Sequence, residues 1–460
     1  MERSILAGVR AIGAACLVLL APVTWGQTWE DVQLASCYCD MAQPDCCDSA
    51  GCCSSCCDGC LSDCGYCCSF PMCDELMCRL TPMMKQMADC GVIYAPGLTQ
   101  FYQGVASGGV AQDFEYGGKV DQFLLLDAGK LGLWDGMTMT LHAETRFGDD
   151  VNQEAVVFAP VNTAMLYPKS GEHDTAITNL SFAQAISDDV QLTFGKTNFI
   201  DFLQLLYPQT GRGVDGFMNA SLLLPVSMAR VAPLSMMNVG ALKMHGKQVQ
   251  GLIVVYDTKN VATTSGLDDL FDNGANIFGY WRFFTERNGL PGSHGFGGIW
   301  STGEFVAFDP TSFVIIPDEG LVATPQGGAY TLAYIYEQTL WMDCCNPKRN
   351  VAVLSQWGIA DEATSPIGWS ANISLQATGF NDARPHDRFG MGYFHTGISN
   401  DLKNLFSGVL PLQDVDGVEI FYSTAIAKGM HLTGDLQVIE PAVVGLDTAV
   451  VAGLRLSAGM

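Results

Sequence analysis

Three ionisable side chains alternate along residues 137–147 and could act together on a polar solute. His142, Glu144 and Arg146 stand two residues apart, and on a β-strand such residues point to the same face. The opposite row is largely apolar and consists of Met137, Met139, Leu141, Ala143, Thr145 and Phe147. Imidazole, carboxylate and guanidinium groups on one face can replace the water around a hydroxylated solute. They can equally form ion pairs that stiffen a wall, and the segment alone leaves both interpretations open.

A second ionic motif lies in the glycine-flanked loop GRGVDG, residues 211–216. Glycine permits backbone bends that other residues rarely adopt, so we expect this loop to fold back against the strands. It would then present Arg212 and Asp215 to the same solute. The alternative is again a structural ion pair.

The sequence contains no pattern typical of an enzyme active site. Neither G-x-S-x-G, nor H-E-x-x-H, nor a phosphate-binding glycine loop occurs. The seven histidines are scattered without metal-ligand spacing, and a metal-ligand role for His142 is disfavoured. We therefore expect no enzyme activity, no cofactor and no metal site. A hydrolytic site assembled from distant strands stays open as an alternative.

The composition excludes two classes of protein. After the N-terminus no uninterrupted apolar run reaches 18 residues, which a helical membrane protein would need. The formal net charge of −25 makes nucleic acid and anionic lipid surfaces poor partners. A chain with 50 glycines, 15% charged residues and a mean hydropathy of +0.19 is instead typical of a transmembrane β-barrel, because half of each strand is polar. An acidic channel would favour neutral or cationic solutes, although acidic loops can also serve solubility alone.

Residues 1–26 are predicted to be a secretory signal peptide. Arg3 and Arg10 precede the apolar stretch from Ala11 to Val23, and small residues follow around Thr24 and Gly26. We therefore expect export from the cytoplasm.

Residues 27–90 form a cysteine-rich segment, with fifteen cysteines between Cys37 and Cys90. In an oxidising envelope such density favours disulfides, although the spacing Cys53-x2-Cys56 would also suit zinc or an iron–sulfur cluster. Cys344 and Cys345 bring the mature total to an odd number, so one thiol is predicted to be idle or to bond another envelope component. The segment is expected to lie in the periplasm and to end in a short helix, Asp74 to Asp89, interrupted by Pro82.

Residues 91–460 are predicted to be one domain of antiparallel strands. Ile367 to Thr378 alternates most cleanly, and short turns such as residues 187–189 contrast with long Gly-rich connections such as Arg287 to Ser301. At ordinary strand and loop lengths the domain holds roughly sixteen strands, as an all-β antiparallel barrel would. Further strands are predicted at Met137 to Phe147, Thr178 to Ile186, Val190 to Lys196, Gly251 to Asp257, Ile277 to Phe284, Ala329 to Leu340, Val351 to Ile359, Val418 to Ile426, Leu432 to Val438 and Thr448 to Met460.

An ordered set of short motifs across this domain resembles the carbohydrate-selective porins of the OprB family. The motifs include residues 101–104 (FYQG), 127–134 (DAGKLGLW), 142–148 (HAETRFG), 160–164 (PVNTA), 211–215 (GRGVD), 343–349, 418–422, 435–441, 447–449 and 453–455. The resemblance implies an outer-membrane barrel through which sugars diffuse passively into the periplasm, in contact with outer-membrane lipid. A homotrimer is among the assemblies that it allows. His142, Glu144, Arg146, Arg212 and Asp215 then become candidate pore-lining residues. The cysteine-rich segment and the final Met460, where an aromatic residue is usual, depart from the family pattern.

A different class of function also accounts for part of the pattern. A secreted or surface-attached β-sandwich adhesin with a cross-linked cysteine-rich module would explain export, cysteines and alternation. It would not explain the order of the motifs. Gel mobility of the detergent-solubilised protein with and without boiling separates the two interpretations, because a barrel should shift its mobility and a sandwich should need no detergent.

Overall fold

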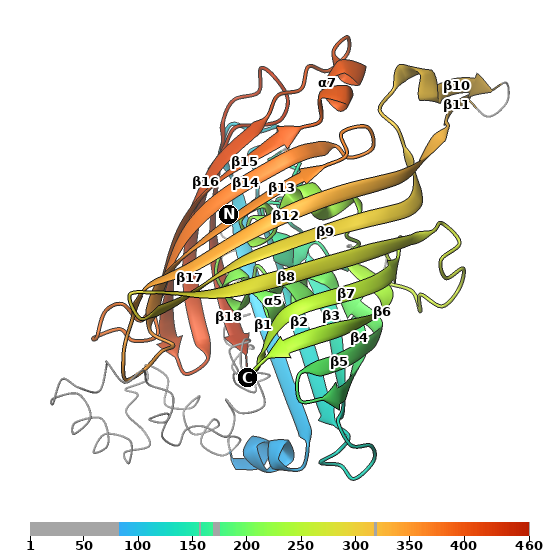
Figure 1. Cartoon of the computed structure of the whole chain (residues 1–460). Helices are drawn as coiled ribbons and strands as arrows, with labels where there is room; N and C mark the ends of the chain where they lie inside the picture. Colours follow the sequence, from blue (N-terminus) through green and yellow to red (C-terminus); the bar gives the residue numbers. More distant parts are fainter. Residues whose placement is uncertain (1–81, 156–157, 169–174, 317–319, 460) are drawn as a thin grey trace.

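The computed structural model describes residues 82–155, 158–168, 175–316 and 320–459. Sixteen strands pair antiparallel with their neighbours in sequence, and β1 pairs with β18 to close one barrel (Figure 1). The barrel strands are β1 (Val92–Ser107), β2 (Phe114–Asp127), β3 (Met137–Gly148), β4 (Thr175–Ser187), β5 (Val190–Asn198), β6 (Ser235–His245), β7 (Gln248–Asp257), β8 (Ala275–Arg287), β9 (Leu290–Val306), β12 (Pro325–Met342), β13 (Asn350–Ala360), β14 (Ile367–Thr378), β15 (Arg388–Ile398), β16 (Val415–Ala427), β17 (Met430–Ile439) and β18 (Ala449–Gly459). The predicted barrel is confirmed, and the two-sheet alternative is wrong because these strands form a single closed sheet.

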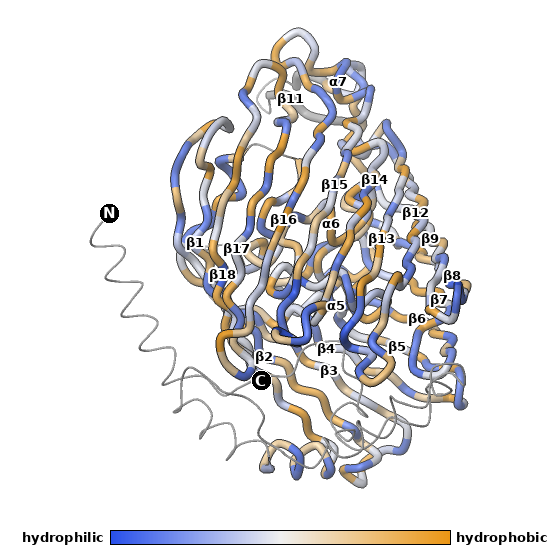
Figure 2. The backbone as a smooth tube through the Cα atoms, turned by 90° about the vertical axis from the view of Figure 1, so that its left-hand side faces the viewer, coloured by the Kyte–Doolittle hydropathy of each residue, from blue (hydrophilic) through white to orange (hydrophobic). Residues whose placement is uncertain are grey.

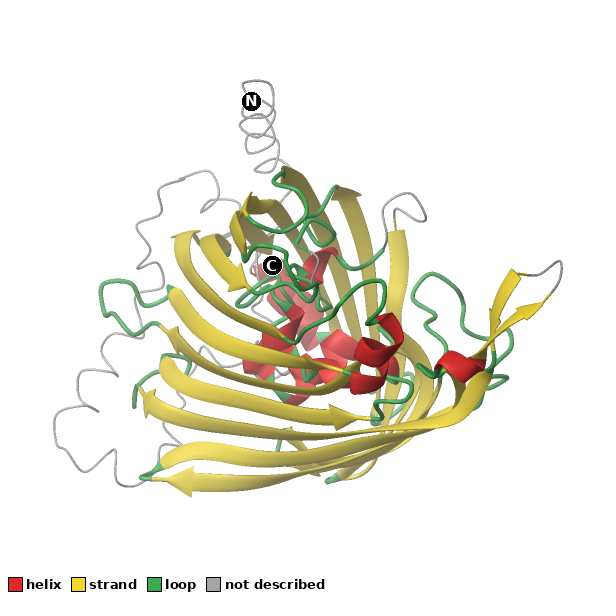
Figure 3. Ribbon diagram, turned by 90° about the horizontal axis from the view of Figure 1, so that it is seen from above, coloured by secondary structure: helices red, strands yellow, loops and turns green. Residues whose placement is uncertain are grey.

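Several short helices lie inside the ring of strands (Figure 3). Four of them belong to the connection between β5 and β6: α5 (Phe199–Leu206), η2 (Pro208–Thr210), α6 (Ala220–Leu223) and η3 (Val226–Arg230). We call residues 199–234 the inward segment. The remaining short elements are η1 (Thr163–Met165), η4 (Pro310–Ser312), α7 (Asn400–Phe406) and the hairpin of β10 (Phe313–Ile316) and β11 (Gly320–Ala323).

A helix over residues 82–89 precedes the barrel, with Pro82 as its first described residue. Proline suits the first turn of a helix because its missing N–H has no partner there. This matches the second half of the helix predicted over Asp74 to Asp89. The signal peptide and the cysteine-rich segment before residue 82 lie outside the described residues. Within the described residues, no helix combines the length and apolar character needed to cross a membrane.

The two ends of the barrel differ in the length of their connections. At one end, two-residue turns at 188–189, 246–247, 288–289 and 428–429 join consecutive strands. The other end carries the inward segment, α7 and the β10–β11 hairpin (Figure 1). Long loops at one end and tight turns at the other are typical of outer-membrane barrels.

The strands alternate between an exposed apolar face and a buried polar face, which gives the alternating colours of Figure 2. On β14, for example, Trp369 and Ile373 are exposed, whereas Ser370, Asn372 and Ser374 are buried inside. The bounds of β14 agree with the predicted strand. In a barrel with apolar residues outside, the outer face meets lipid and the polar face meets the interior.

One predicted connection is wrong, because residues 287–301 are mostly strand β9. Gly292, Gly295, Gly297 and Gly298 gave this stretch the composition of a loop. The structure gives a reason for one of them: a Cβ on Gly295 would overlap the hydroxyl group of Tyr207 in the inward segment. Glycine in a strand often marks such a close approach.

The apolar core lies inside the barrel, between the wall and the inward segment. Phe199, Leu203 and Leu206 of α5 belong to one buried cluster with Phe278 of β8 and Ile299 of β9. A second cluster joins residues of the inward segment to β15, β16 and β18. The interior is therefore a partly filled passage and not an empty cylinder.

Candidate functional site

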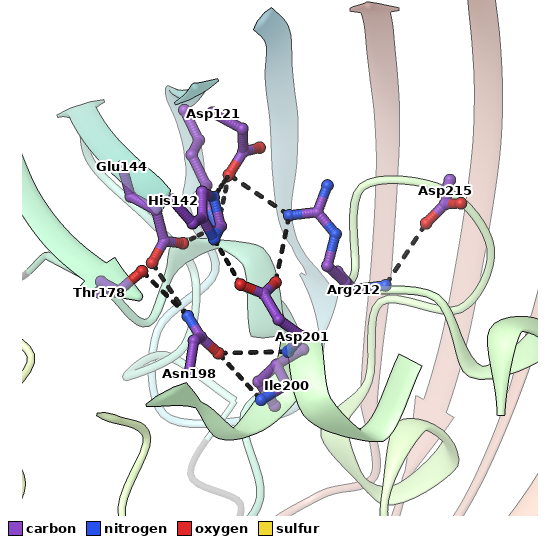
Figure 4. Close-up of polar contacts among 10 residues, drawn as sticks. Asp121, His142, Glu144, Thr178, Asn198, Ile200, Asp201, Arg212 and Asp215 are labelled. Carbon is purple, nitrogen blue, oxygen red and sulfur yellow. Dashed lines mark hydrogen bonds and ion pairs between the residues drawn. The ribbon is translucent and has the colours of Figure 1, made fainter. Parts of the chain in front are cut away.

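The start of the inward segment is fixed to the wall by a helix cap. The side-chain oxygen of Asn198 accepts hydrogen bonds from the backbone N–H groups of Ile200 (2.9 Å) and Asp201 (3.3 Å). Asparagine at this position stabilises a helix start because it satisfies otherwise unpaired N–H groups. The Nδ2 of Asn198 donates to Oε2 of Glu144 on β3 at 3.2 Å and to Oγ1 of Thr178 on β4 at 3.1 Å. The cap thus joins α5 to two strands (Figure 4).

His142 lies between two carboxylates from different elements. Its Nδ1 is 2.7 Å from Oδ2 of Asp201 on α5, and its Nε2 is 2.8 Å from Oδ1 of Asp121 on β2. The Phe123 ring stacks on the imidazole with centroids 3.7 Å apart. Ionised carboxylates only accept hydrogen bonds, so this arrangement suits an imidazolium that donates from both nitrogens.

Two further cations complete the group. The Nζ of Lys119 is 3.2 Å from Oδ1 of Asp121 and also forms an ion pair with Glu144. From the inward segment, Nη1 of Arg212 reaches Asp121 at 3.6 Å and Asp201 at 3.7 Å. We call these six residues, Lys119, Asp121, His142, Glu144, Asp201 and Arg212, the charge network. Figure 4 labels all of them except Lys119.

Five of the six residues of the charge network are buried, and the side chain of Asp201 is 15% exposed. His142 has 0% of its surface exposed, and Glu144 and Arg212 are also buried. Burial disfavours the charge of Arg212, but its carboxylate neighbours, chiefly Asp121 and Asp201, outweigh this and raise its pKa above the ordinary value. The adjoining cavity has a volume of about 30 Å³, room for one water molecule. In this arrangement the network attaches the inward segment to β2 and β3.

Two carboxylates and one imidazole of the network lie close enough together to be considered as ligands of a metal ion. Ligand atoms of Asp121, His142 and Glu144 lie within 4.8 Å of one another. However, Lys119 and Arg212 already oppose these carboxylates, and their positive charges would repel a metal ion. We assign no metal here.

The structure therefore separates the five predicted site residues. It brings His142, Glu144 and Arg212 together in the charge network. Arg146 instead forms an ion pair with Asp150 and donates from Nη1 to the carbonyl of Met165, so it holds the β3–β4 connection. Contact of any of these residues with solute stays a prediction.

Asp215 has a different environment, beside a strand residue that the sequence analysis missed. Its Oδ2 is 3.4 Å from Nη1 of Arg388, the first residue of β15, and the side chains are 31% and 23% exposed. The Asp215 carbonyl also accepts from the same Nη1 at 3.2 Å. Arg388 was missed because it stands at the strand end, after the turn of residues 379–387. Its place on the row that includes the buried Phe394 was the available signal.

Comparison with known proteins agrees with this architecture. The high-pH structure of OprB from Pseudomonas putida has a TM-score of 0.67 at 17% identity, over 82% of this chain and 96% of that one. OmpF of Salmonella typhi, in complex with daunomycin, has a TM-score of 0.50 at 9% identity, over 81% of this chain and 98% of that one. At such identities the likeness shows the fold alone. No curated protein matches the sequence.

A sequence family match goes further than these structural likenesses. Residues 111–460, well over half of the chain, match the family described as carbohydrate-selective porin, OprB family. The matched region covers nearly the whole closed barrel and the inward segment. The chain therefore belongs to the OprB family of carbohydrate-selective porins and is an outer-membrane channel.

Proposed function

We propose that sugars cross this porin by passive diffusion past a constriction made by the inward segment, and that Asp215 and Arg388 contact them there. The observation that supports this best is the position of the inward segment inside the barrel (Figure 3). Asp215 of this segment and Arg388 of β15 form a partly exposed pair. The long-loop end of the barrel is the extracellular end in this proposal, and the short turns face the periplasm.

The chemistry of this pair suits a hydroxylated solute. A guanidinium group can donate to sugar oxygens, and a carboxylate can accept from sugar hydroxyls. Gln376 on β14 lies near the pair and donates from Nε2 to the carbonyl of Gln209 at 2.8 Å, so it attaches the inward segment to the wall beside Asp215 and Arg388. Partial exposure keeps such contacts weak enough for the solute to leave, as conduction requires.

The extracellular mouth favours neutral over anionic sugars. Its described residues include a group of acidic side chains on β2 and the adjoining connections, namely Asp113, Glu115, Asp149, Asp150 and Glu154. Their summed negative potential repels anions and concentrates cations near the entrance. We expect sugar phosphates to permeate more slowly than the corresponding neutral sugars.

Variants of the exposed pair test the proposed contact. In a liposome-swelling assay with a neutral disaccharide, we expect Asp215→Asn and Arg388→Gln each to change the permeation rate several-fold, because each removes a charged hydrogen-bonding group. Asp416→Asn is the matched control, since Asp416 accepts from the His395 ring at 2.9 Å on the outer face of the barrel. Unchanged disaccharide rates in both variants of the pair would exclude it from the sugar path.

We also propose that this channel has no catalytic activity. The buried state of His142 and Glu144 supports this, because a solute cannot reach them for proton transfer. Purified protein incubated with ester, peptide and lipid substrates should give no turnover. Hydrolysis that co-purifies with the barrel and disappears in a His142 variant would show an enzyme instead.

Two further predictions concern assembly. We propose a homotrimer and a cross-linking role for the cysteine-rich segment, most of which lies outside the described residues. Analytical ultracentrifugation in detergent, with and without a reductant, tests both. Sedimentation as a monomer with and without the reductant would contradict the trimer. A sedimentation profile that the reductant leaves unchanged would contradict the cross-link to another envelope component.

A further inference from the structure

The later part of the inward segment is attached to the wall by contacts that bind its main chain. Wall side chains donate to its carbonyl groups or accept from its N–H groups, over residues 213–231. The contacts are Arg455 Nη1 to Gly213 O (2.9 Å), Glu419 from the N–H groups of Met218 and Asn219, Asn372 Nδ2 to Ser221 O (2.6 Å), Gln356 Nε2 to Leu223 O (3.3 Å) and Tyr256 OH to Val231 O (2.8 Å).

Glu419 on β16 makes two of these contacts with one carboxylate. Its Oε1 accepts from the N–H of Met218 at 2.6 Å, and its Oε2 accepts from the N–H of Asn219 at 2.9 Å. The side chain is fully buried. A buried carboxyl group without partners is costly, and here each of its two oxygens accepts an N–H bond from the turn. This side chain therefore favours one position of residues 218–219.

The same turn is held from its other side. Arg455 on β18 is also fully buried and donates to the carbonyl of Gly213. Between these two points, the Phe217 ring packs edge-on against Phe421 of β16, with centroids 5.0 Å apart. Asp215 lies within the turn, between Gly213 and Met218. Any displacement of the turn would move Asp215 relative to Arg388.

We propose that Glu419 is a positioning residue that fixes the turn of residues 213–219 and thereby the shape of the constriction. It acts through the backbone N–H groups of Met218 and Asn219 and does not contact the solute. The effect of Glu419 on sugar transport rests on the proposed contact of Asp215 with the solute. The fixed position of the turn does not depend on that contact, because it is measured in salt solution without sugar.

Glu419→Gln tests this role with little change in volume. The amide nitrogen of glutamine cannot accept a hydrogen bond, so one of the two N–H bonds is lost and its donor is left buried. We expect the displaced turn to be populated roughly tenfold more often, as the loss of one buried hydrogen bond implies. Single-channel recordings in potassium chloride should show this as new subconductance states or increased open-channel noise.

Asp416→Asn is the matched control. Asp416 lies on the same strand β16, but on the outer face of the barrel, where it accepts from the His395 ring at 2.9 Å. This variant removes a carboxylate from the same strand and leaves both N–H acceptors of the turn in place, so its recordings should remain like those of the wild type. Equal noise in Glu419→Gln and the wild type would overturn the proposal, as would equal changes in both variants.

Two further measurements keep the outcome decisive. If Glu419→Gln does not form a heat-modifiable barrel, Arg455→Gln replaces it, because that variant loosens the same turn at Gly213. Unchanged open-channel noise in Arg455→Gln also overturns the proposal.

The variant and the wild type are then compared by liposome swelling with sugars of increasing size. Increased noise with unchanged sugar selectivity would retain the positioning role and reject Asp215 as a solute contact.

Discussion

The two halves of the inward segment are attached to the barrel by different chemistry. The first half, residues 199–212, is held by ionised side chains, as in the contact of Asp201 with His142, and by two wall contacts to its main chain, at the carbonyls of Leu206 and Gln209. In the second half, wall residues such as Glu419 and Arg455 bind the main chain, and the ion pair of Asp215 with Arg388 is partly exposed. A side-chain pair depends on the residue type of both partners, whereas a main-chain contact depends on the residue type of the wall partner. The main-chain contacts of the second half should therefore tolerate changes of its exposed side chains, such as Asp215.

The largest expected effect is in the charge network. Lys119→Met leaves the carboxylates of Asp121 and Glu144 buried without their shared cation. Breaking a buried ion pair in this way typically costs about 3–5 kcal/mol. Urea unfolding of the refolded protein in liposomes, with intrinsic fluorescence as the signal, measures the loss of free energy of unfolding.

A second buried lysine provides the control for this comparison. The Nζ of Lys196 donates to the carbonyls of Ala262 (3.3 Å) and Thr264 (2.8 Å), which are neutral acceptors. Because no carboxylate loses its counter-ion, Lys196→Met should cost less, about 1–3 kcal/mol. If Lys119→Met and Lys196→Met lost equal free energies of unfolding, charge pairing would not be what distinguishes the attachment of the first half of the inward segment.

An intermediate effect is expected within the first half, directly after the end of α5. Gly295→Ala places a methyl group against the hydroxyl of Tyr207, and overpacking of this kind costs roughly 1–3 kcal/mol. Tyr207→Phe in the same chain removes that hydroxyl and should recover part of the loss. Gly279→Ala is the control, since nothing lies within 4 Å of its added Cβ. Unfolding curves of all four proteins give the comparison, and a loss in Gly279→Ala as large as in Gly295→Ala would contradict the account.

The smallest effect concerns pH and the turn that leads into β15. Burial opposes the Asp387 carboxylate, but hydrogen bonds from Arg384 and Tyr422, among others, outweigh it and hold its pKa below the ordinary 3.8. A carboxyl group with a lowered pKa stabilises the fold above its unfolded-state pKa, and the contribution is lost as the pH falls through the folded-state value. Hydrogen exchange in residues 379–387 should therefore accelerate in acid below about pH 4. Asp387→Asn should lose this acid dependence; its retention would assign the effect to other groups.

The sequence predicted the barrel better than it predicted the interior. Strands such as β14 were found because their alternation is unbroken, whereas β9 was missed because its glycines, among them Gly295 beside Tyr207, gave it the composition of a loop. His142 and Arg212 were found because they occur in compact ionic motifs. Glu419 and Arg455 stand alone in their strands, and Arg455 meets a carbonyl 242 residues away. Such partners are set by closure of the barrel, which no local pattern records.

The most direct test of the central claim is the permeability of the wild-type protein to sugars. In proteoliposomes, neutral sugars should enter at rates that fall with increasing chain length, and they should enter faster than neutral non-sugar solutes of similar size. That result is predicted by a fixed constriction with polar contacts inside an open barrel. Proteoliposomes that conduct salt and yet exclude every sugar, including monosaccharides, would contradict it.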